Sequence, residues 1–163
     1  LSLHDALPIW VDRWAETPVG FVPFSHLRAI GDWLSDPVAV AEQLVGTPYL
    51  WGGKSSLGID CSGLVQVSLS AAGTGCPRDS DMQLSLGAAI SAPFQRGDLV
   101  FWKGHVGIMQ NQHHLLHANA SSMNVTSEPL ALARDRIIQR GGGDITAVRR
   151  LLPLPSRAPH KPL

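Results

Sequence analysis

The stretch "DCSGLVQVSLSAAG", residues 60–73, reads as one buried helix. Its apolar residues recur every three or four positions and form two adjacent stripes, Leu64, Val67 and Ala71 on one and Val65, Leu69 and Ala72 on the other. A helix with apolar or small residues on most sides belongs to a core. Gly73 marks its predicted end. Cys61 falls in its first turn.

Cys61 is a candidate nucleophile because of this place at a helix start. Unpaired backbone N–H groups and the positive end of the helix dipole favour an anion there, so we expect the thiol pKa to be lowered from about 8.5. The same N–H groups can stabilise an oxyanion. The alternative is a small buried apolar residue. A disulfide with Cys76 is not expected, because the helix between them spans about 15 Å, whereas bridged Cα atoms lie within about 7 Å.

Two further helices are predicted around the central one. The Asp-Pro pair at 36–37 supplies an N-cap and a first-turn residue, and the apolar spacing that follows predicts a helix over 37–45. Ser80 and Gln83 form a capping-box pattern, which predicts another short helix after the central one. The chain therefore begins its main domain with three helices.

Beyond these helices the apolar period changes to two. Four strand-like segments separated by short turns predict an antiparallel meander over 98–102, 105–109, 114–120 and 124–128. A surface helix over 129–137 and a last strand over 144–152 follow. Helices first and strands afterwards predict an α+β domain, which we place at 36–152.

His105 and His117 fall on consecutive predicted strands. A three-residue loop over 110–112 would set them directly opposite each other on one face, with Cβ atoms about 4.5–5.5 Å apart, whereas a two-residue loop would separate their faces. With the three-residue loop, His117 fixes the tautomer of His105, whose other nitrogen takes the thiol proton, as in a Cys-His-His triad. Gly104 and Gly107 flank His105, either to keep the strand slim beside a substrate or to form a tight hairpin.

Composition narrows the class of protein. The 163 residues are enough for one real core, and 13 basic side chains balance 13 acidic ones, so no nucleic-acid partner is expected. No apolar run approaches the about 20 residues that cross a bilayer, so no integral membrane segment is expected either. Two cysteines without a plausible bridge favour the cytoplasm, with a periplasmic or secreted location as the alternative.

The two ends of the chain are expected to lie outside the main domain. Residues 1–9 lack the features of a signal peptide and resemble a translated sequencing adapter, so they are treated as non-native and the natural N-terminus is left open. Residues 10–31 alternate apolar and polar positions around a Pro-Val-Gly turn, which predicts a small β structure or, alternatively, an irregular arm. The proline-rich residues 153–163 predict a disordered tail.

Six motifs follow one another in the order and spacing of a known family: "TPYLWGG", "GIDCSGLVQ", "PRDSDMQ", "RGDLVFW", "HVGIM" and "LLHANA". Over roughly residues 38–150 the chain resembles the NlpC-type cell-wall peptidases, which are papain-like cysteine enzymes. The resemblance implies N-terminal helices packed on a C-terminal antiparallel sheet. The segment "GFVPFSHL" within residues 10–35 resembles the last strands of the bacterial Src-homology-type barrels that precede such enzymes, so a partial barrel and a linker are expected there.

The resemblance also implies a reaction. In that family the motif positions make Cys61 the nucleophile, His105 the base and His117 the third polar residue. The bond cut is in a peptidoglycan stem peptide, between D-γ-glutamate and a diamino acid such as meso-diaminopimelate. The "PRDSDMQ" motif most resembles members that take short stem peptides with a free N-terminal L-alanine. No metal or organic cofactor is required.

Three residues near the nucleophile are implied in substrate binding. Tyr49, twelve residues before the cysteine, corresponds to the oxyanion side. Asp60 and Ser62 correspond to residues that bind the free amino end of the peptide, and a carboxylate beside a helix start can pair with an ammonium group. The alternative for Asp60 is a simple N-cap.

Three other functions remain open on the sequence. Cys61, His105 and His117 offer three zinc ligands with an open fourth position, although the compact ligand pairs usual in zinc sites are absent from the sequence. A non-catalytic wall-binding module is a second alternative. Acyl transfer by the same three residues is a third, since papain-like folds also host it.

Overall fold

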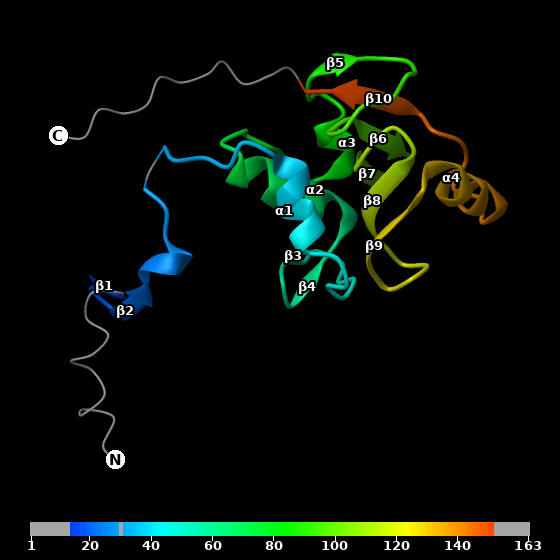
Figure 1. The fold of residues 1–163 in the computed structure, drawn as a ribbon. Helices are drawn as coiled ribbons and strands as arrows, with labels where there is room; N and C mark the ends of the chain where they lie inside the picture. The colour runs from blue at the N-terminus through cyan, green and yellow to red at the C-terminus, as the bar shows by residue number, and fades with distance from the viewer. Residues whose placement is uncertain (1–13, 30, 152–163) are drawn as a thin grey trace. The chain divides into compact units, whose positions relative to one another are not determined.

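The computed structural model describes residues 14–29 and 31–151 (Figure 1). The chain divides into two compact units between Trp33 and Leu34, and each is described by itself. The residues of the predicted non-native segment, 1–9, and of the predicted tail, 153–163, lie outside the described residues.

The first unit is a β-hairpin followed by one turn of 3-10 helix. Strand β1 (Trp14–Thr17) pairs antiparallel with β2 (Gly20–Pro23), and Thr17 lies opposite Gly20. The Thr17 hydroxyl donates to the Gly20 carbonyl, and Gly20 has a positive φ of 134°. The expected β structure around the Pro-Val-Gly turn is therefore present as a hairpin. Its descent from a barrel stays a prediction.

The second unit carries three helices before most of its sheet. These are α1 (Pro37–Gln43), α2 (Cys61–Ala71) and α3 (Ser80–Gln83), with a small two-stranded sheet of β3 (Lys54–Ser55) and β4 (Gly58–Ile59) just before α2. Helix α4 (Leu130–Gln139) follows the meander. The α+β order expected from the sequence is confirmed.

Six strands form the main sheet in the order β5-β10-β6-β7-β8-β9, and every pair is antiparallel. Their bounds are β5 (Ala88–Ala89), β6 (Leu99–Trp102), β7 (His105–Met109), β8 (His114–Asn119), β9 (Asn124–Pro129) and β10 (Ala147–Arg150). The predicted meander is confirmed as β6 to β9. The sequence did not reveal β5, nor the place of the last strand, β10, between β5 and β6.

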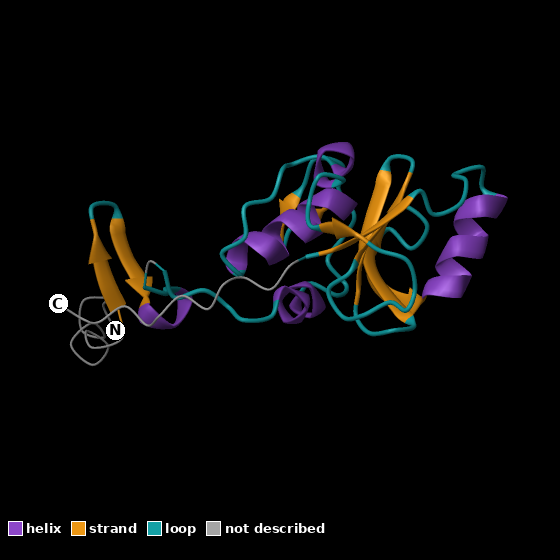
Figure 2. Cartoon of the chain, turned by 90° about the horizontal axis from the view of Figure 1, so that it is seen from above, coloured by secondary structure: helices purple, strands orange, loops and turns teal. Residues whose placement is uncertain are grey.

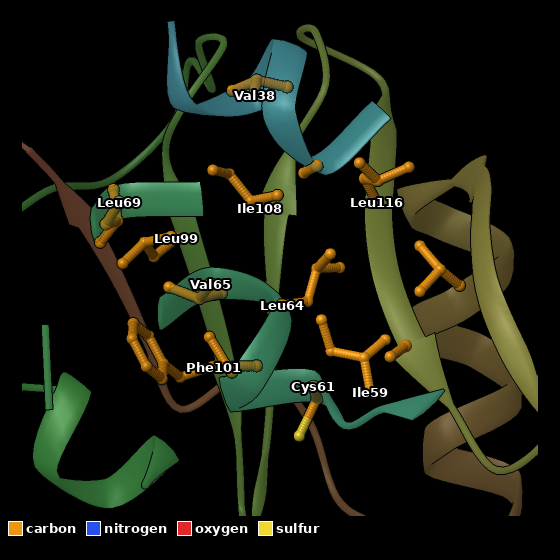
Figure 3. Close-up of a cluster of buried hydrophobic side chains, with 14 residues drawn as sticks. Val38, Ile59, Cys61, Leu64, Val65, Leu69, Leu99, Phe101, Ile108 and Leu116 are labelled. Carbon is orange, nitrogen blue, oxygen red and sulfur yellow. The ribbon is translucent and has the colours of Figure 1, made fainter. Parts of the chain in front are cut away.

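Helices cover both faces of this sheet. Figure 2 shows α4 on one side and the other helices of the unit on the opposite side. Buried side chains of α2 pack with one set of strand residues, as the labelled residues of Figure 3 show: Leu64, Val65, Leu69, Leu99, Phe101, Ile108 and Leu116. A second cluster lies under α4 and contains Val100, Trp102, Met109, Leu115, Leu130 and Ala133. Two covered faces explain why β6 reads as an unbroken apolar run.

The central helix was predicted correctly. Leu64 is 1% exposed and Val65 and Leu69 are fully buried. The Asp60 carboxylate caps the helix by accepting a hydrogen bond from the Gly63 N–H. After its C-cap, Gly73 takes a positive φ of 76°, so the glycine that was expected to end the helix lies just beyond it.

The capping box predicted for α3 is wrong. The N-cap is Asp79, without a side-chain cap, and the helix has one turn. The Gln83 side chain is instead buried and donates its amide N–H to the carbonyls of Ser62 and Pro77. This glutamine therefore ties α3 to the first turn of α2 rather than capping its own helix.

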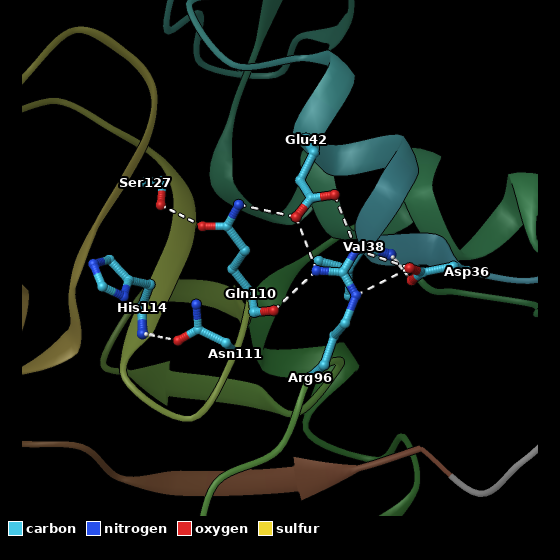
Figure 4. A network of polar contacts seen from close by, with 8 residues as sticks. All are labelled: Asp36, Val38, Glu42, Arg96, Gln110, Asn111, His114 and Ser127. Carbon is cyan, nitrogen blue, oxygen red and sulfur yellow. Dashed lines mark hydrogen bonds and ion pairs between the residues drawn. The ribbon is translucent and has the colours of Figure 1, made fainter.

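Arg96 and Gln110 form a polar network that links α1, the turn between β7 and β8, and β9 (Figure 4). The Arg96 guanidinium donates to the carboxylates of Asp36 and Glu42 and to the carbonyl of Gln110. The Gln110 side chain donates to Glu42 and accepts from the hydroxyl of Ser127 on β9. These contacts hold α1 against the turn between β7 and β8. The arginine lowers the pKa of Glu42 to about 2.

Candidate active site

Cys61 is the first residue of α2 and lies on the wall of an open pocket of about 680 Å³. Its side chain is 6% exposed, and its sulfur projects from the edge of the apolar cluster in Figure 3. The other walls come from Trp51 and Gly52, from the loop and first turn of α3 at residues 78–81, and from Gly104 in the hairpin before β7. The candidate nucleophile thus has a space in front of it large enough for part of a peptide.

The backbone N–H groups of Val106 and Ser62 lie near the Cys61 sulfur and act to lower the pKa of its thiol. Val106 follows His105 on β7, so the start of α2 meets the sheet at the position of the candidate base. Helix α2 packs against β7, the strand that begins at His105, so Cys61 and His105 lie on neighbouring elements. Their pairing as nucleophile and base stays a prediction.

We expected the helix start to lower the pKa of the Cys61 thiol, and this prediction is wrong because the pKa is raised overall. Burial raises the pKa of Cys61, and the charge of Asp60 raises it further, whereas the backbone N–H donors act in the opposite direction. Desolvation of the thiolate outweighs these donors. In the free protein Cys61 is a neutral thiol at pH 7.

His105 and His117 form a hydrogen-bonded pair. The His105 Nε2 and His117 Nδ1 atoms lie 2.8 Å apart, and the ring centroids lie 5.0 Å apart with the rings nearly edge to face. His105 is half-buried, and His117 is fully buried. This is the contact that the strand pattern predicted between the two rings.

The predicted register between the two strands is wrong by two residues. Ile108 pairs with Leu116 and Met109 with Leu115, so Gly107, not His105, falls opposite His117. The Gln110 N–H donates to the His114 carbonyl, which places the three-residue loop at 111–113 instead of 110–112. A shift of two preserves which face each side chain occupies, so the histidines still share a face as diagonal neighbours.

The two glycines beside His105 have different reasons. Gly104 has a positive φ of 73° in the two-residue turn between β6 and β7, so it serves the hairpin. A Cβ on Gly107 would come within 2.7 Å of Leu115 Cδ1 and 3.1 Å of His117 Cβ. Gly107 therefore makes room for the neighbouring strand and not for a substrate.

Three residues that sequence reasoning missed surround His117. Its Nε2 lies 2.7 Å from Glu128 Oε1 on β9 and 3.2 Å from Asn119 Nδ2 on its own strand. Arg136 of α4 donates to both oxygens of the Glu128 carboxylate. The sequence showed Glu128 only as an acidic residue at the end of a predicted strand. Its contact with His117 depends on the order and register of the strands.

The protonation states of this group follow from burial and charge. Arg136 is the main cause that lowers the pKa of Glu128 to about 2, so its carboxylate is ionised. Burial, with His117 and Arg136, lowers the pKa of His105 to about 3, while Glu128 opposes that shift. At pH 7 His105 is neutral and able to accept a proton.

Asp60 lines the pocket and is held by its neighbours. Its carboxylate accepts from the N–H groups of Gly52 and Gly63 and forms a two-pronged ion pair with Arg78, with the shorter N···O distance at 2.6 Å. Its implied role in binding the amino end of a substrate stays a prediction. The observed role is the alternative one, an N-cap, extended by an ion pair to the pocket loop.

Ser62 directly follows Cys61 in the chain, whereas Tyr49 is influenced by the charges of Cys61 and Asp60. The buried Ser62 hydroxyl accepts from Arg78 and lies 3.3 Å from Asp60 Oδ1, so it belongs to the same ion-pair cluster. Burial raises the pKa of the half-buried Tyr49, and the charges of Cys61 and Asp60 raise it further. The tyrosine hydroxyl therefore keeps its proton and remains a hydrogen-bond donor.

The zinc alternative fits this arrangement poorly. His117 uses both ring nitrogens for contacts with His105 and Glu128, so it offers no lone pair to a metal. Among the described residues, no group of three or more histidine, cysteine or acidic side chains is placed to hold a metal ion.

None of the helices in residues 14–29 and 31–151 is long and apolar enough to cross a membrane.

Known proteins resemble this chain in sequence. A family model described as "NlpC/P60 family" matches residues 46–139. The chain is 38% identical over 96 residues to dipeptidyl-peptidase 6 of Lysinibacillus sphaericus, covering 55% of this chain and 35% of that protein. It is 32% identical over 104 residues to a γ-D-glutamyl-L-lysine dipeptidyl-peptidase of Bacillus cereus, covering 58% and 31%. The chain thus spans about a third of the length of these curated relatives.

Solved structures show the same fold. An NlpC/P60 family protein from Bacillus cereus superposes with a TM-score of 0.70 at 26% identity, covering 86% of this chain and 50% of that one. The peptidoglycan hydrolase RipB of Mycobacterium tuberculosis superposes with a TM-score of 0.61 at 27% identity, covering 85% and 73%. The papain-like fold expected from the sequence is confirmed.

Proposed function

The chain belongs to the NlpC/P60 family, and on that premise we propose that it is a cysteine peptidase that cuts peptidoglycan stem peptides between D-γ-glutamate and a diamino acid. One observation carries the proposal. Cys61 lines a pocket near the backbone N–H group of Val106, the residue after His105, and His105 is hydrogen-bonded to the buried His117. Relatives named as γ-D-glutamyl-L-lysine dipeptidyl-peptidases support the choice of bond.

The reaction begins from a neutral thiol and a neutral imidazole. The Cys61 sulfur attacks the carbonyl carbon of the γ-glutamyl amide while His105 takes the thiol proton. The carbonyl oxygen becomes an oxyanion, which the N–H groups at the start of α2 and the Tyr49 hydroxyl stabilise. The imidazolium then gives its proton to the amide nitrogen, the C–N bond breaks, and the diamino acid leaves as an amine.

Water completes the cycle. His105, neutral again, takes a proton from a water molecule that attacks the thioester carbonyl. The C–S bond breaks, the proton returns to the sulfur, and the free γ-carboxylate of the D-glutamate departs. His117 keeps the His105 ring oriented throughout. No metal ion or organic cofactor takes part in these steps.

The amino end of the stem peptide has other carboxylates to meet than Asp60. Asp79 and Asp81 both line the pocket, and both are exposed. A free ammonium group placed between the pocket loop and Cys61 would gain charge-assisted hydrogen bonds from them. Trp51, 82% exposed at the rim, supplies an apolar wall for the peptide. We therefore assign the amino-end contact to this loop.

Mass spectrometry of L-Ala-γ-D-Glu-diaminopimelate incubated with the protein tests the proposal. We expect release of L-Ala-D-Glu and free diaminopimelate by the wild type and none by Cys61→Ala. An added amine such as hydroxylamine identifies acyl transfer if it appears in the product. Turnover that is equal in the two proteins, or no turnover by either, would overturn the proposal.

We also propose a cytoplasmic site of action. Cys61 and Cys76 are both free thiols, which is the rule in reducing compartments. Immunodetection after fractionation of cells that produce the natural protein tests the location. Recovery in the periplasmic or extracellular fraction would contradict it.

A further inference from the structure

Three side chains contact the nitrogen atoms of the buried His117 ring, and two of them contact the same nitrogen. Its Nδ1 lies 2.8 Å from His105 Nε2, and its Nε2 lies 2.7 Å from Glu128 Oε1 and 3.2 Å from Asn119 Nδ2. The ring is fully buried, so water does not substitute for any of these partners. The protons on His117 must therefore be set by these neighbours.

Glu128 is held in place as an anion. Arg136 of α4 donates to both of its oxygens, and the two side chains are only 16% and 28% exposed. An ionised carboxylate accepts hydrogen bonds and donates none. Its short contact with His117 Nε2 thus requires a proton on that nitrogen.

Resting on the proposed function, we propose that Glu128 is a positioning residue that fixes the proton positions of both histidines. His117 donates from Nε2 to Glu128, so its Nδ1 is the acceptor. His105 must then donate from Nε2 to His117. This leaves Nδ1 of His105 without a proton, as the atom that takes the proton of Cys61. Arg136 serves by keeping Glu128 charged and oriented.

Asn119 makes this role necessary. Its Oδ1 accepts from the N–H groups of Ser121 and Ser122, so its amide N–H₂ is directed at His117 Nε2. Without Glu128, Asn119 would donate to Nε2 and move the His117 proton to Nδ1. That proton would face His105 Nε2 and force the His105 proton onto Nδ1. The base would then present an N–H group to the thiol.

The tautomers can be observed without any substrate. In protein labelled with ¹⁵N-histidine, long-range ¹H–¹⁵N correlation spectra at pH 7 distinguish the two neutral tautomers. We expect a proton on Nε2 in both His105 and His117 of the wild type. A proton on Nδ1 of His117 would overturn the proposal, whether or not the protein is active.

Variants test the consequence for the reaction. In Glu128→Gln, the amide carbonyl is expected to turn to Arg136 and the N–H₂ to His117, which reverses both tautomers. We expect kcat to fall about 100-fold with KM within about twofold, because the fault is in the base and not in the pocket. Asp144→Asn is the matched control, since it breaks another ion pair of α4, with Arg134, and should leave kcat unchanged.

A rescue separates positioning from a structural role. Asn119→Asp in the Glu128→Gln background puts a carboxylate oxygen near His117 Nε2, while the other oxygen still accepts from Ser121 and Ser122. We expect the wild-type tautomers and at least a tenth of wild-type kcat to return. Loss in Glu128→Gln with no rescue and with unchanged tautomers would overturn the proposal. Expected tautomers in a wild type that cuts no stem peptide would instead sink the proposed function and leave the assignment of Glu128 standing.

Discussion

At the scale of single residues, burial pushes the two reacting groups toward their neutral forms. It raises the pKa of Cys61 and lowers that of His105 to about 3. In the free protein Cys61 and His105 are therefore not a thiolate and an imidazolium. Proton transfer has to accompany the attack on the substrate, which makes the tautomer of His105 decisive.

Alkylation kinetics test the resting state of Cys61. In a Cys76→Ser background, the rate with iodoacetamide should keep rising with pH and reach its midpoint above 9.0, the ordinary thiol value. The physical reason is the desolvation of the thiolate at 6% exposure. A rate that is already constant between pH 6 and 8 would show a preformed thiolate and contradict this prediction.

The neutral His105 should also make the protein sensitive to acid. Its pKa is about 3 in the folded chain and near 6.5 in the unfolded chain, so the unfolded state gains the proton first and stability falls as pH drops from 6.5 toward 3. Between pH 6.5 and 5 the loss should be roughly 2 kcal/mol. The charged or titratable groups that act on this ring are His117, Glu128 and Arg136.

Urea unfolding at pH 6.5 and pH 5 measures that loss, and His105→Asn is the comparison. The variant should lose roughly 2 kcal/mol less over this interval, because Asn does not titrate. Glu128 titrates in the same sense only below pH 4.5 and contributes little in this range. Equal losses in the two proteins would show that the pKa of His105 is close to normal.

Local sequence was enough to single out the three proposed catalytic residues, and not the residues that contact His117. Cys61 was identifiable from a helix start, and His105 with His117 from two strands that the period of two makes visible. Glu128 and Arg136 reach His117 only through the pairing of β8 with β9 and the packing of α4. Arg78 donates to the Asp60 carboxylate, which lies 18 residues earlier in the chain, and no local sequence pattern indicates that contact.

At the scale of elements, the parity of the β7–β8 register matters more than its value. The predicted and observed registers differ by two residues, and the histidines share a face in both. A change of one residue would have buried one ring under α2 and left the other under α4. Strand parity was readable from the apolar pattern, whereas the exact pairs depended on where the turn closed.

Gly107 sets the spacing of these two strands, and Gly107→Ala tests it. The added methyl group would press on Leu115 and on the Cβ of His117 at 2.7 and 3.1 Å. We expect a loss of about 1–3 kcal/mol in unfolding free energy and a fall in kcat, since His117 would shift from His105. Urea unfolding and steady-state kinetics measure the two effects.

Gly75→Ala is the matched control for this substitution. A Cβ at Gly75 has no heavy atom within 4 Å, and the residue is exposed. Its stability and kcat should stay near those of the wild type. Wild-type values for Gly107→Ala would mean that β8 yields easily and that the strand spacing is not set by this glycine.

At the scale of the whole second unit, the Arg96 network and the active site share no residue. Arg96 links α1 to the strand ends through Asp36, Glu42 and Gln110, with side chains between about a third and two fifths exposed. The Arg96→Ala variant should lose about 1–2 kcal/mol of stability at low salt and less at high salt, because partly exposed pairs are screened. Its kcat should stay within about twofold of the wild type.

Urea unfolding at two salt concentrations, together with kinetics below the midpoint of unfolding, measures these quantities. Asp144→Asn again provides the comparison, because it removes a more exposed ion pair from a single site. A loss of kcat in folded Arg96→Ala protein would show that the packing of α1 reaches the reacting groups.

The position of β10 in the sheet determines when the sheet can be completed during synthesis. Strand β10 lies inside the sheet, between β5 and β6, although it comes after the other strands in residues 31–151. On the ribosome, the cysteine leaves the exit tunnel long before Arg136 and β10 do. A nascent chain therefore carries the proposed nucleophile for several seconds without a complete sheet or an anchored His117, and the proposed hydrolysis must wait until β10 has been synthesised.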